Sequence, residues 1–208
     1  MPIPDFQSIM LPLLKFSHDQ LEHNTKEAVA ELAKYFKLSD EDLTKLLPSG
    51  TQKTFSNRVF WAKAYLKMAG LIENTKRAHF KITPKGFKVL QENPKEINLK
   101  FLKQFPEYIE LTESWKKEKG ESEKENIDQE SINIQTPEEI IEISYQNIRK
   151  SLAQDLIAKV KTCSSSFFEK LVVELLVKMG YGGSLKDAGK AIGKSGDEGI
   201  DGIIKGHL

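Results

Sequence analysis

Residues 54 to 90 have the sequence TFSNRVFWAKAYLKMAGLIENTKRAHFKITPKGFKVL, and this stretch decides the fold of the N-terminal part of the chain. Apolar residues recur at helical spacing over about 54–69, and Gly70 follows as a natural stop because glycine readily adopts the left-handed conformation at a helix C-terminus. Two short apolar runs then flank a basic turn at 74–78, and Thr83-Pro84 is a typical helix start. The stretch predicts a helix, a β-hairpin and a closing helix.

Three further helices are expected before this stretch. The first covers 6–17 with apolar residues at helical spacing, although Pro12 inside it favours a kink or a late start. The second is capped at Asn24 or Thr25, and a short third helix begins with a capping-box pattern at Ser39. Helices followed by a hairpin and one more helix are the order of a winged helix, which is a helix-turn-helix variant with a β-wing. We therefore predict a winged-helix domain over residues 1–92.

The composition is that of a globular protein of one domain or two small ones. The chain has 208 residues, of which 39% are hydrophobic and 29% charged, and no apolar run approaches the ~20 residues of a membrane span. The N-terminus lacks the pattern of a signal peptide, and the single Cys163 excludes an internal disulfide framework. Four scattered histidines and one cysteine leave almost no ligands for zinc. These features predict a cytoplasmic protein with no membrane partner.

The net charge of +1 hides two oppositely charged blocks. Residues 51–91 contain nine Lys or Arg and one acid, whereas residues 107–142 contain twelve Asp or Glu and four Lys. Such segregation indicates that one part contacts a polyanion and another is a solvated spacer. High charge with few apolar residues cannot bury enough surface to fold, so residues 93–135 are expected to form an acidic linker.

The basic block contains the residue types that bind DNA. Arginine and asparagine can read base edges in the major groove, and lysines can neutralise phosphates. Side chains at the start of a helix can also donate to phosphate, because the helix N-terminus favours anions. The predicted DNA-binding residues are Thr54, Ser56, Asn57, Arg58 and Trp61 on the helix, with Lys76 and Arg77 in the wing. Two alternatives are a winged helix that binds another protein, and a core role for Trp61 and Tyr65.

The C-terminal third predicts two helices and then a glycine-rich region. One helix starts at Thr136-Pro137 and runs to about residue 160, and a strongly amphipathic one covers 167–179. Nine of the thirteen glycines then lie between Gly180 and Gly206, and Ile203-Ile204 is expected to open a strand whose partners lie beyond Leu208.

Two acids in this third are candidates for metal-dependent chemistry. Asp201 ends a glycine-rich acidic loop just before the expected strand, where a carboxylate could bind Mg²⁺, although an ordinary polar turn would have the same composition. Glu169 could point toward the same site, or it could complete a capping box with Ser166. Asp197 and Glu198 are expected to be solvated loop residues.

Several motifs together resemble a known family, the Mrr-type restriction endonucleases. In the C-terminal third they are Phe-Phe-Glu-Lys-Leu-Val at 167–172 and Gly-Asp-Glu-Gly-Ile-Asp-Gly-Ile-Ile at 196–204. In the N-terminal part they are Leu-Leu-Pro-Ser-Gly at 46–50, Asn-Arg-x-x-Trp-Ala at 57–62 and Ile-Thr-Pro-x-Gly at 82–86. The resemblance covers about 1–92 and 165–205, in the order in which the family has its DNA-binding and catalytic domains.

The resemblance implies a modification-dependent, type IV restriction enzyme that cleaves foreign methylated double-stranded DNA with Mg²⁺. Its fold would be mainly α with an α/β C-terminal part, in which residues 136–208 form the N-terminal portion of a PD-(D/E)xK nuclease domain. By position, Asp201 corresponds to the family's first metal-ligating acid and Glu169 to its helix acid. A bound metal would polarise the scissile phosphate and help to ionise the attacking water.

The same resemblance sets the limits of the predicted activity. The family's second motif, Gln-x-Lys on the next strand, has no counterpart before Leu208. A chain without this motif is expected to bind DNA with little cleavage. The alternative is a DNA-binding winged-helix regulator, or a non-catalytic relic. The sequence is compatible with a homodimer as well as with a monomer.

Overall fold

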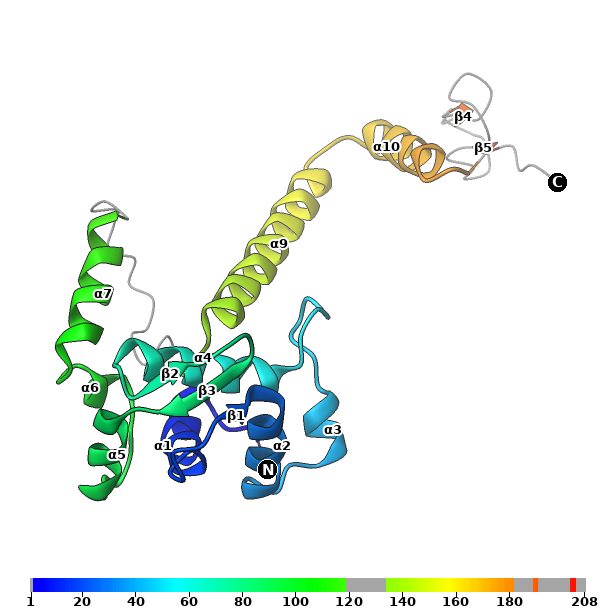
Figure 1. The fold of residues 1–208 in the computed structure, drawn as a ribbon. Helices are drawn as coiled ribbons and strands as arrows, with labels where there is room; N and C mark the ends of the chain where they lie inside the picture. The colour runs from blue at the N-terminus through cyan, green and yellow to red at the C-terminus, as the bar shows by residue number, and fades with distance from the viewer. Residues whose placement is uncertain (1, 119–133, 182–188, 191–202, 205–208) are drawn as a thin grey trace. The chain divides into compact units, whose positions relative to one another are not determined.

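The computed structural model describes residues 2–118, 134–181, 189–190 and 203–204, and the chain divides into two compact units, Met1–Tyr145 and Gln146–Leu208 (Figure 1). The first unit is mostly helical with a small antiparallel sheet. Its helices up to residue 118 are α1 (Phe6–Phe16), α2 (Thr25–Tyr35), α3 (Asp40–Thr44), α4 (Thr54–Met68), α5 (Pro84–Gln91), α6 (Leu99–Leu102) and α7 (Pro106–Glu118). Helix α9 (Pro137–Lys161) starts in the first unit and ends in the second.

The predicted hairpin is confirmed and forms most of the sheet. Strand β2 (Ile72–Asn74) pairs antiparallel with β3 (His79–Ile82), with Ile72 opposite Ile82. A short strand that sequence reasoning missed, β1 (His23–Asn24), pairs with the other edge of β3, so the sheet order is β1-β3-β2. Two residues carry too little periodicity to predict a strand.

Local capping explains where the helices begin. Asn24 caps α2 and forms a capping box with Glu27, while Ser39 forms the same box with Asp42 at α3. Helix α1 continues through Pro12 from Phe6, so the proline does not delay its start.

The core of the first unit forms where α1 and α4 pack together. It contains the buried side chains of Phe6, Ile9, Met10, Leu13 and Leu14 from α1 and of Phe55, Val59, Ala62 and Leu66 from α4. Each of these side chains except the small Ala62 contributes about 1.5–3 kcal/mol on burial. Helix α5 approaches this core very closely, since a Cβ added to Gly86 would lie 2.1 Å from the carbonyl oxygen of Leu71.

The core extends past the predicted boundary at residue 92. Ile97, Leu102, Phe105 and Tyr108 are all buried in it, and they come from the loop before α6, from α6, from the turn after it and from α7. The predicted acidic linker over 93–135 therefore starts too early. The prediction rested on the high charge of this whole segment, in which four widely spaced apolar residues are hard to recognise as core. Residues 119–133 of that predicted linker lie outside the described residues.

The second unit contains the rest of α9 and α10 (Ser165–Lys178), with β4 (Gly189–Lys190) and β5 (Ile203–Ile204). The strand predicted at Ile203-Ile204 is confirmed, but its partner is the upstream strand β4, with Gly189 opposite Ile204. The prediction that its partners lie beyond Leu208 missed this pairing, because a two-residue strand among glycines has no distinctive sequence pattern. In the described part of the chain, no helix is both long and apolar enough to cross a membrane.

Candidate nucleic-acid interface

Helix α4 turns its core residues inward and divides its remaining surface into an open flank and a covered flank. On the open flank, Lys53, Phe60 and Lys67 are exposed and Ser56 is half-buried. These residues lie three, four and seven positions apart, so they form one ridge along the helix. The sequence prediction named Ser56 and counted the two lysines only as part of the basic block. It missed Phe60, because an exposed phenylalanine resembles a core residue in a sequence.

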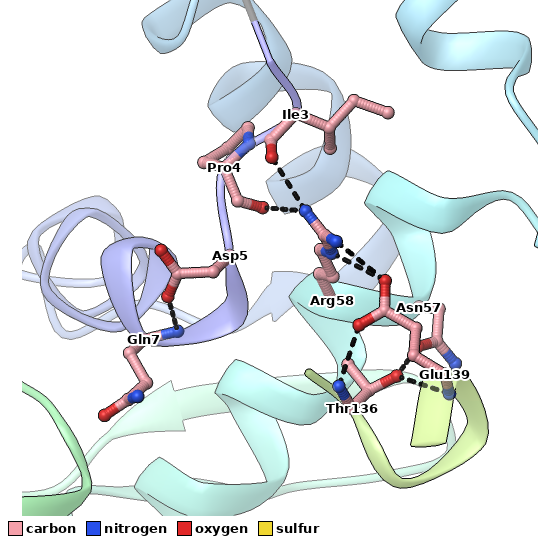
Figure 2. Close-up of polar contacts among 8 residues, drawn as sticks. All are labelled: Ile3, Pro4, Asp5, Gln7, Asn57, Arg58, Thr136 and Glu139. Atoms are coloured by element: carbon pink, nitrogen blue, oxygen red, sulfur yellow. Dashed lines mark hydrogen bonds and ion pairs between the residues drawn. The ribbon is translucent and has the colours of Figure 1, made fainter. Parts of the chain in front are cut away.

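The covered flank contains the predicted base-reading residues Asn57 and Arg58 (Figure 2). Asn57 is only 3% exposed, its side-chain carbonyl accepts a hydrogen bond of 2.7 Å from the Thr136 hydroxyl, and its amide donates to Gln52. The guanidinium of Arg58 contacts one oxygen of Glu139 through Nε at 2.9 Å and Nη2 at 2.8 Å. We define residues 136–142 as the docking segment.

The docking segment makes two further contacts through acidic side chains. The indole nitrogen of Trp61 donates to the carboxylate of Glu138, and the backbone N–H of Ser49 donates to Glu142 at 2.8 Å. Tyr65 instead stacks on Phe6 at 5.2 Å between ring centroids, in agreement with the core alternative for that residue. Each of the three glutamates in the docking segment therefore accepts from a donor on α4 or in the loop before it.

The fold holds Glu139 at this position through the helix start predicted at Thr136. The Thr136 N–H donates to Glu139 Oε2 at 2.8 Å and the Glu139 N–H donates to the Thr136 hydroxyl at 3.3 Å, which is a capping box. The two carboxylate oxygens thus bind different partners, one the cap and one Arg58. The side chains of Glu139 and Arg58 are 8% and 19% exposed, so they form a largely desolvated ion pair. The remaining nitrogen of Arg58, Nη1, donates to the backbone carbonyls of Ile3 and Pro4 at 2.7 and 3.0 Å (Figure 2).

The β2–β3 turn places the two predicted wing residues in solvent. Lys76 pairs with Glu22 at 2.6 Å, and hydrogen bonds from Lys76 and Thr75 hold the pKa of the Glu22 carboxyl below its usual range. Arg77 is exposed, and the turn closes at Ala78, whose φ of 63° is unusual for a residue with a side chain.

Lys63 lies between the hairpin and α2 and is partly buried. Its ammonium donates to the Thr25 hydroxyl at 3.0 Å and lies 5.1 Å from the centroid of the Phe80 ring. Burial, with a smaller contribution from the nearby Lys67 charge, lowers the pKa of Lys63. This lysine is therefore better placed to hold the hairpin than to contact a ligand.

Intramolecular ion pairs neutralise part of the basic block. Arg58, Lys76, Lys81 and Lys85 pair with Glu139, Glu22, Glu73 and Glu107 respectively. Three of these four acids lie outside residues 51–91, so a charge count over a continuous window could not include them. Among the described residues, the basic side chains of this block that are exposed and make no ion pair are Lys53, Lys67, Arg77 and Lys88.

The predicted nuclease residues are placed only in part. Asp201, with Asp197 and Glu198, lies outside the described residues. Glu169 lies in the second turn of α10, whose N-cap is Ser164 accepting from the Phe167 N–H at 3.3 Å, so the alternative of a capping box with Ser166 is wrong. Within the described residues, no three His, Cys, Asp or Glu side chains are grouped so as to hold a metal ion.

Comparisons with known proteins agree with the two-part organisation. Residues 6–92 match the model of the Mrr N-terminal domain, and residues 160–208 match a restriction endonuclease model, that of the Mrr catalytic domain. The chain is 27% identical over 218 aligned residues to the type IV methyl-directed restriction enzyme EcoKMrr of Escherichia coli K12, covering 98% of this chain and 68% of that enzyme. No solved structure matches the chain. With both domain matches in this order on one chain, the protein is similar in both of its parts to the Mrr family of restriction endonucleases.

Proposed function

We propose that this chain is a restriction protein that binds double-stranded DNA through a winged helix within residues 1–92. Helix α4 is the recognition helix, and the β2–β3 hairpin is the wing. One observation carries the proposal: the residues that match the Mrr N-terminal domain form a unit in which α4 leads directly into a hairpin with an exposed basic turn.

The contacts available on this surface suit a duplex. The open flank of α4 presents a basic and aromatic ridge of Lys53, Phe60 and Lys67 on an α-helix, and the major groove admits an α-helix. Arg77 and Lys76 on the wing can neutralise the flanking phosphates, Lys76 by exchanging Glu22 for a phosphate oxygen. The predicted DNA-binding residues Asn57, Arg58 and Trp61 lie on the covered flank. They can contact DNA only when the docking segment has left this flank.

The second unit is proposed to be part of a nuclease domain. Restriction endonucleases generally use Mg²⁺, which when bound polarises the scissile phosphate. Asp201 and Glu169 are the proposed metal-binding acids, on the strength of the family motifs alone. Methylated DNA is the proposed substrate because the E. coli relative is described as methyl-directed.

A binding assay tests the DNA-binding proposal. Fluorescence anisotropy with a labelled 20-base-pair duplex would compare wild type with Lys53→Ala/Lys67→Ala and with Lys76→Ala/Arg77→Ala. If each lost residue contacts one phosphate, each double variant should bind more weakly, and its slope of log affinity against log salt should fall by about 2. The charge-matched control is Lys15→Ala/Lys34→Ala, two exposed lysines of α1 and α2. Equal losses in the control and the two test variants would refute this surface as the binding site.

A cleavage assay tests the nuclease proposal separately. Methylated and unmethylated plasmids are incubated with the protein and Mg²⁺, or with EDTA, and nicking is scored on gels. Nicking of methylated plasmid that requires Mg²⁺ and disappears in Asp201→Ala supports the proposed function. DNA binding without any such nicking would favour a DNA-binding regulator instead.

A further inference from the structure

We infer that the docking segment is an intramolecular competitor of DNA, in which three glutamates occupy donors that DNA oxygens would otherwise take. This inference rests on the proposed DNA-binding function of α4. The three acids are Glu138, Glu139 and Glu142, which accept from Trp61, from Arg58 and from the backbone N–H of Ser49.

The chemistry of the covered donors matches that of a DNA-binding surface. A guanidinium, an indole N–H and a backbone N–H are groups that proteins use to bind phosphate and sugar oxygens. The carboxylate of Glu139 has the same charge sign and presents the same kind of oxygen acceptor to Arg58 as a phosphate does. Asn57, an amide suited to reading adenine, is likewise occupied by the hydroxyl of Thr136.

Binding of the docking segment and binding of DNA to this flank exclude each other. The Nε and Nη2 groups of Arg58 contact Glu139, and its Nη1 group contacts the carbonyls of Ile3 and Pro4. A phosphate can reach Arg58 only where Glu139 has left. The apparent affinity for DNA is then the intrinsic affinity multiplied by the fraction of molecules with this flank uncovered.

The docking segment is attached mainly by polar groups, which makes release by a polyanion feasible. None of residues 134–145 belongs to the hydrophobic core cluster of the first unit. Ile140 is half-buried, whereas Ile141 and Ile143 are 67% and 39% exposed, so release of the segment would uncover less apolar surface than removal of a core helix would. The segment is held by one ion pair and by hydrogen bonds, and DNA oxygens can accept from the same Arg58, Trp61 and Ser49 donors.

Removal of the two less buried acids tests the inference without disturbing Glu139 or the cap. In the full chain, Glu138→Ala/Glu142→Ala should bind a 20-base-pair duplex at least fivefold more tightly than wild type. Lower negative charge alone also strengthens DNA binding, so the matched control is Glu110→Ala/Glu113→Ala, two exposed glutamates of α7. In a Trp115→Phe background, the emission of Trp61 should shift to longer wavelength in the docking-segment variant without DNA, and again in wild type on DNA addition.

A locked form provides the opposite perturbation. In a Cys163→Ser background, Ser49→Cys and Glu142→Cys are joined by a short bismaleimide, which holds the docking segment against the loop before α4. The cross-linked protein should bind DNA at least tenfold more weakly than the same protein before cross-linking. Circular dichroism of both forms checks that the fold is retained.

The outcomes separate the two proposals. If the lysine and wing variants weaken DNA binding but the docking-segment variants match the α7 control, the competition is refuted and the proposed function stands. If the docking-segment variants bind DNA more weakly, the segment supports the DNA-binding surface, which also overturns the inference. If wild type binds no duplex at low salt and neither the docking-segment variant nor the lysine variants change this, the proposed function itself fails.

Discussion

The ion pair between Arg58 and Glu139 should be strongly coupled in a double-mutant cycle. We consider Glu139→Gln, Arg58→Met and the double variant. Glutamine preserves the acceptor that the capping box requires at this position, so Glu139→Gln removes the charge and keeps the helix start. Methionine preserves much of the arginine side-chain volume without its donors.

The magnitude follows from burial. Exposed ion pairs contribute about 0.2–1 kcal/mol, whereas removal of one partner from a buried pair costs about 3–5 kcal/mol. The side chains here are 19% and 8% exposed, so an intermediate cost of about 2 kcal/mol is expected for Glu139→Gln. Arg58→Met should cost more, about 3 kcal/mol, because it also leaves the carbonyls of Ile3 and Pro4 without their donor. The coupling energy should then be about 1.5 kcal/mol.

Urea unfolding of the full chain, followed by far-UV circular dichroism, measures these free energies. Tryptophan fluorescence is unsuitable as the only probe, because Trp61 itself donates to the docking segment. The slope m should stay constant across the cycle, which confirms that the same surface is exposed on unfolding. A coupling energy below about 0.5 kcal/mol, which is the usual error of additivity, would refute the argument that this pair holds the docking segment.

Three further predictions concern the same unit. Gly86→Ala should destabilise the first unit by more than the roughly 1–3 kcal/mol typical of overpacking, because the new Cβ would lie 2.1 Å from the Leu71 carbonyl oxygen. Thermal unfolding measures the loss of stability, and an unchanged midpoint would contradict the close approach of α5 to Leu71. Burial, with a smaller effect of Tyr65, raises the pKa of Tyr108 to about 12 from 10.0, so the folded state favours the neutral phenol. The resulting contribution to stability is complete below pH 10 and is lost as the pH rises toward 12, so urea unfolding at pH 9 and pH 11 should show a larger loss in wild type than in Tyr108→Phe. Finally, Glu22→Gln should free Lys76 on the wing and raise DNA affinity about twofold, a gain that anisotropy should no longer detect when Lys76→Ala is added.

Local patterns in the sequence were sufficient for most elements of the first unit. The capping residues Asn24 and Ser39, the stop at Gly70 and the Thr83-Pro84 start act within one turn of their own helix, so neighbouring residues specify them. The core stripe of α4 was likewise visible, because its apolar residues recur at helical spacing.

The candidate site was predicted by residue type but not by exposure. Asn57, Arg58 and Trp61 have side chains suited to DNA, and no sequence pattern shows that each is bound by a residue about 80 positions later. The sequence shows the positions of these residues on α4 and, separately, the acids of the docking segment. Only the tertiary structure shows that the two contact each other and so cover one flank of α4.

The sequence by itself thus determined most of the helices and the hairpin, the similarity to the family, and the residue types of the proposed DNA-binding surface, because these follow from periodicity, caps and short motifs. The tertiary structure alone decided the extension of the core through Tyr108, the pairing of the basic block with distant acids, and the division of α4 into an open and a covered flank. The physical reason is that burial and ion pairing depend on which segments meet in space, and residues such as Arg58 and Glu139 meet across 81 positions of sequence.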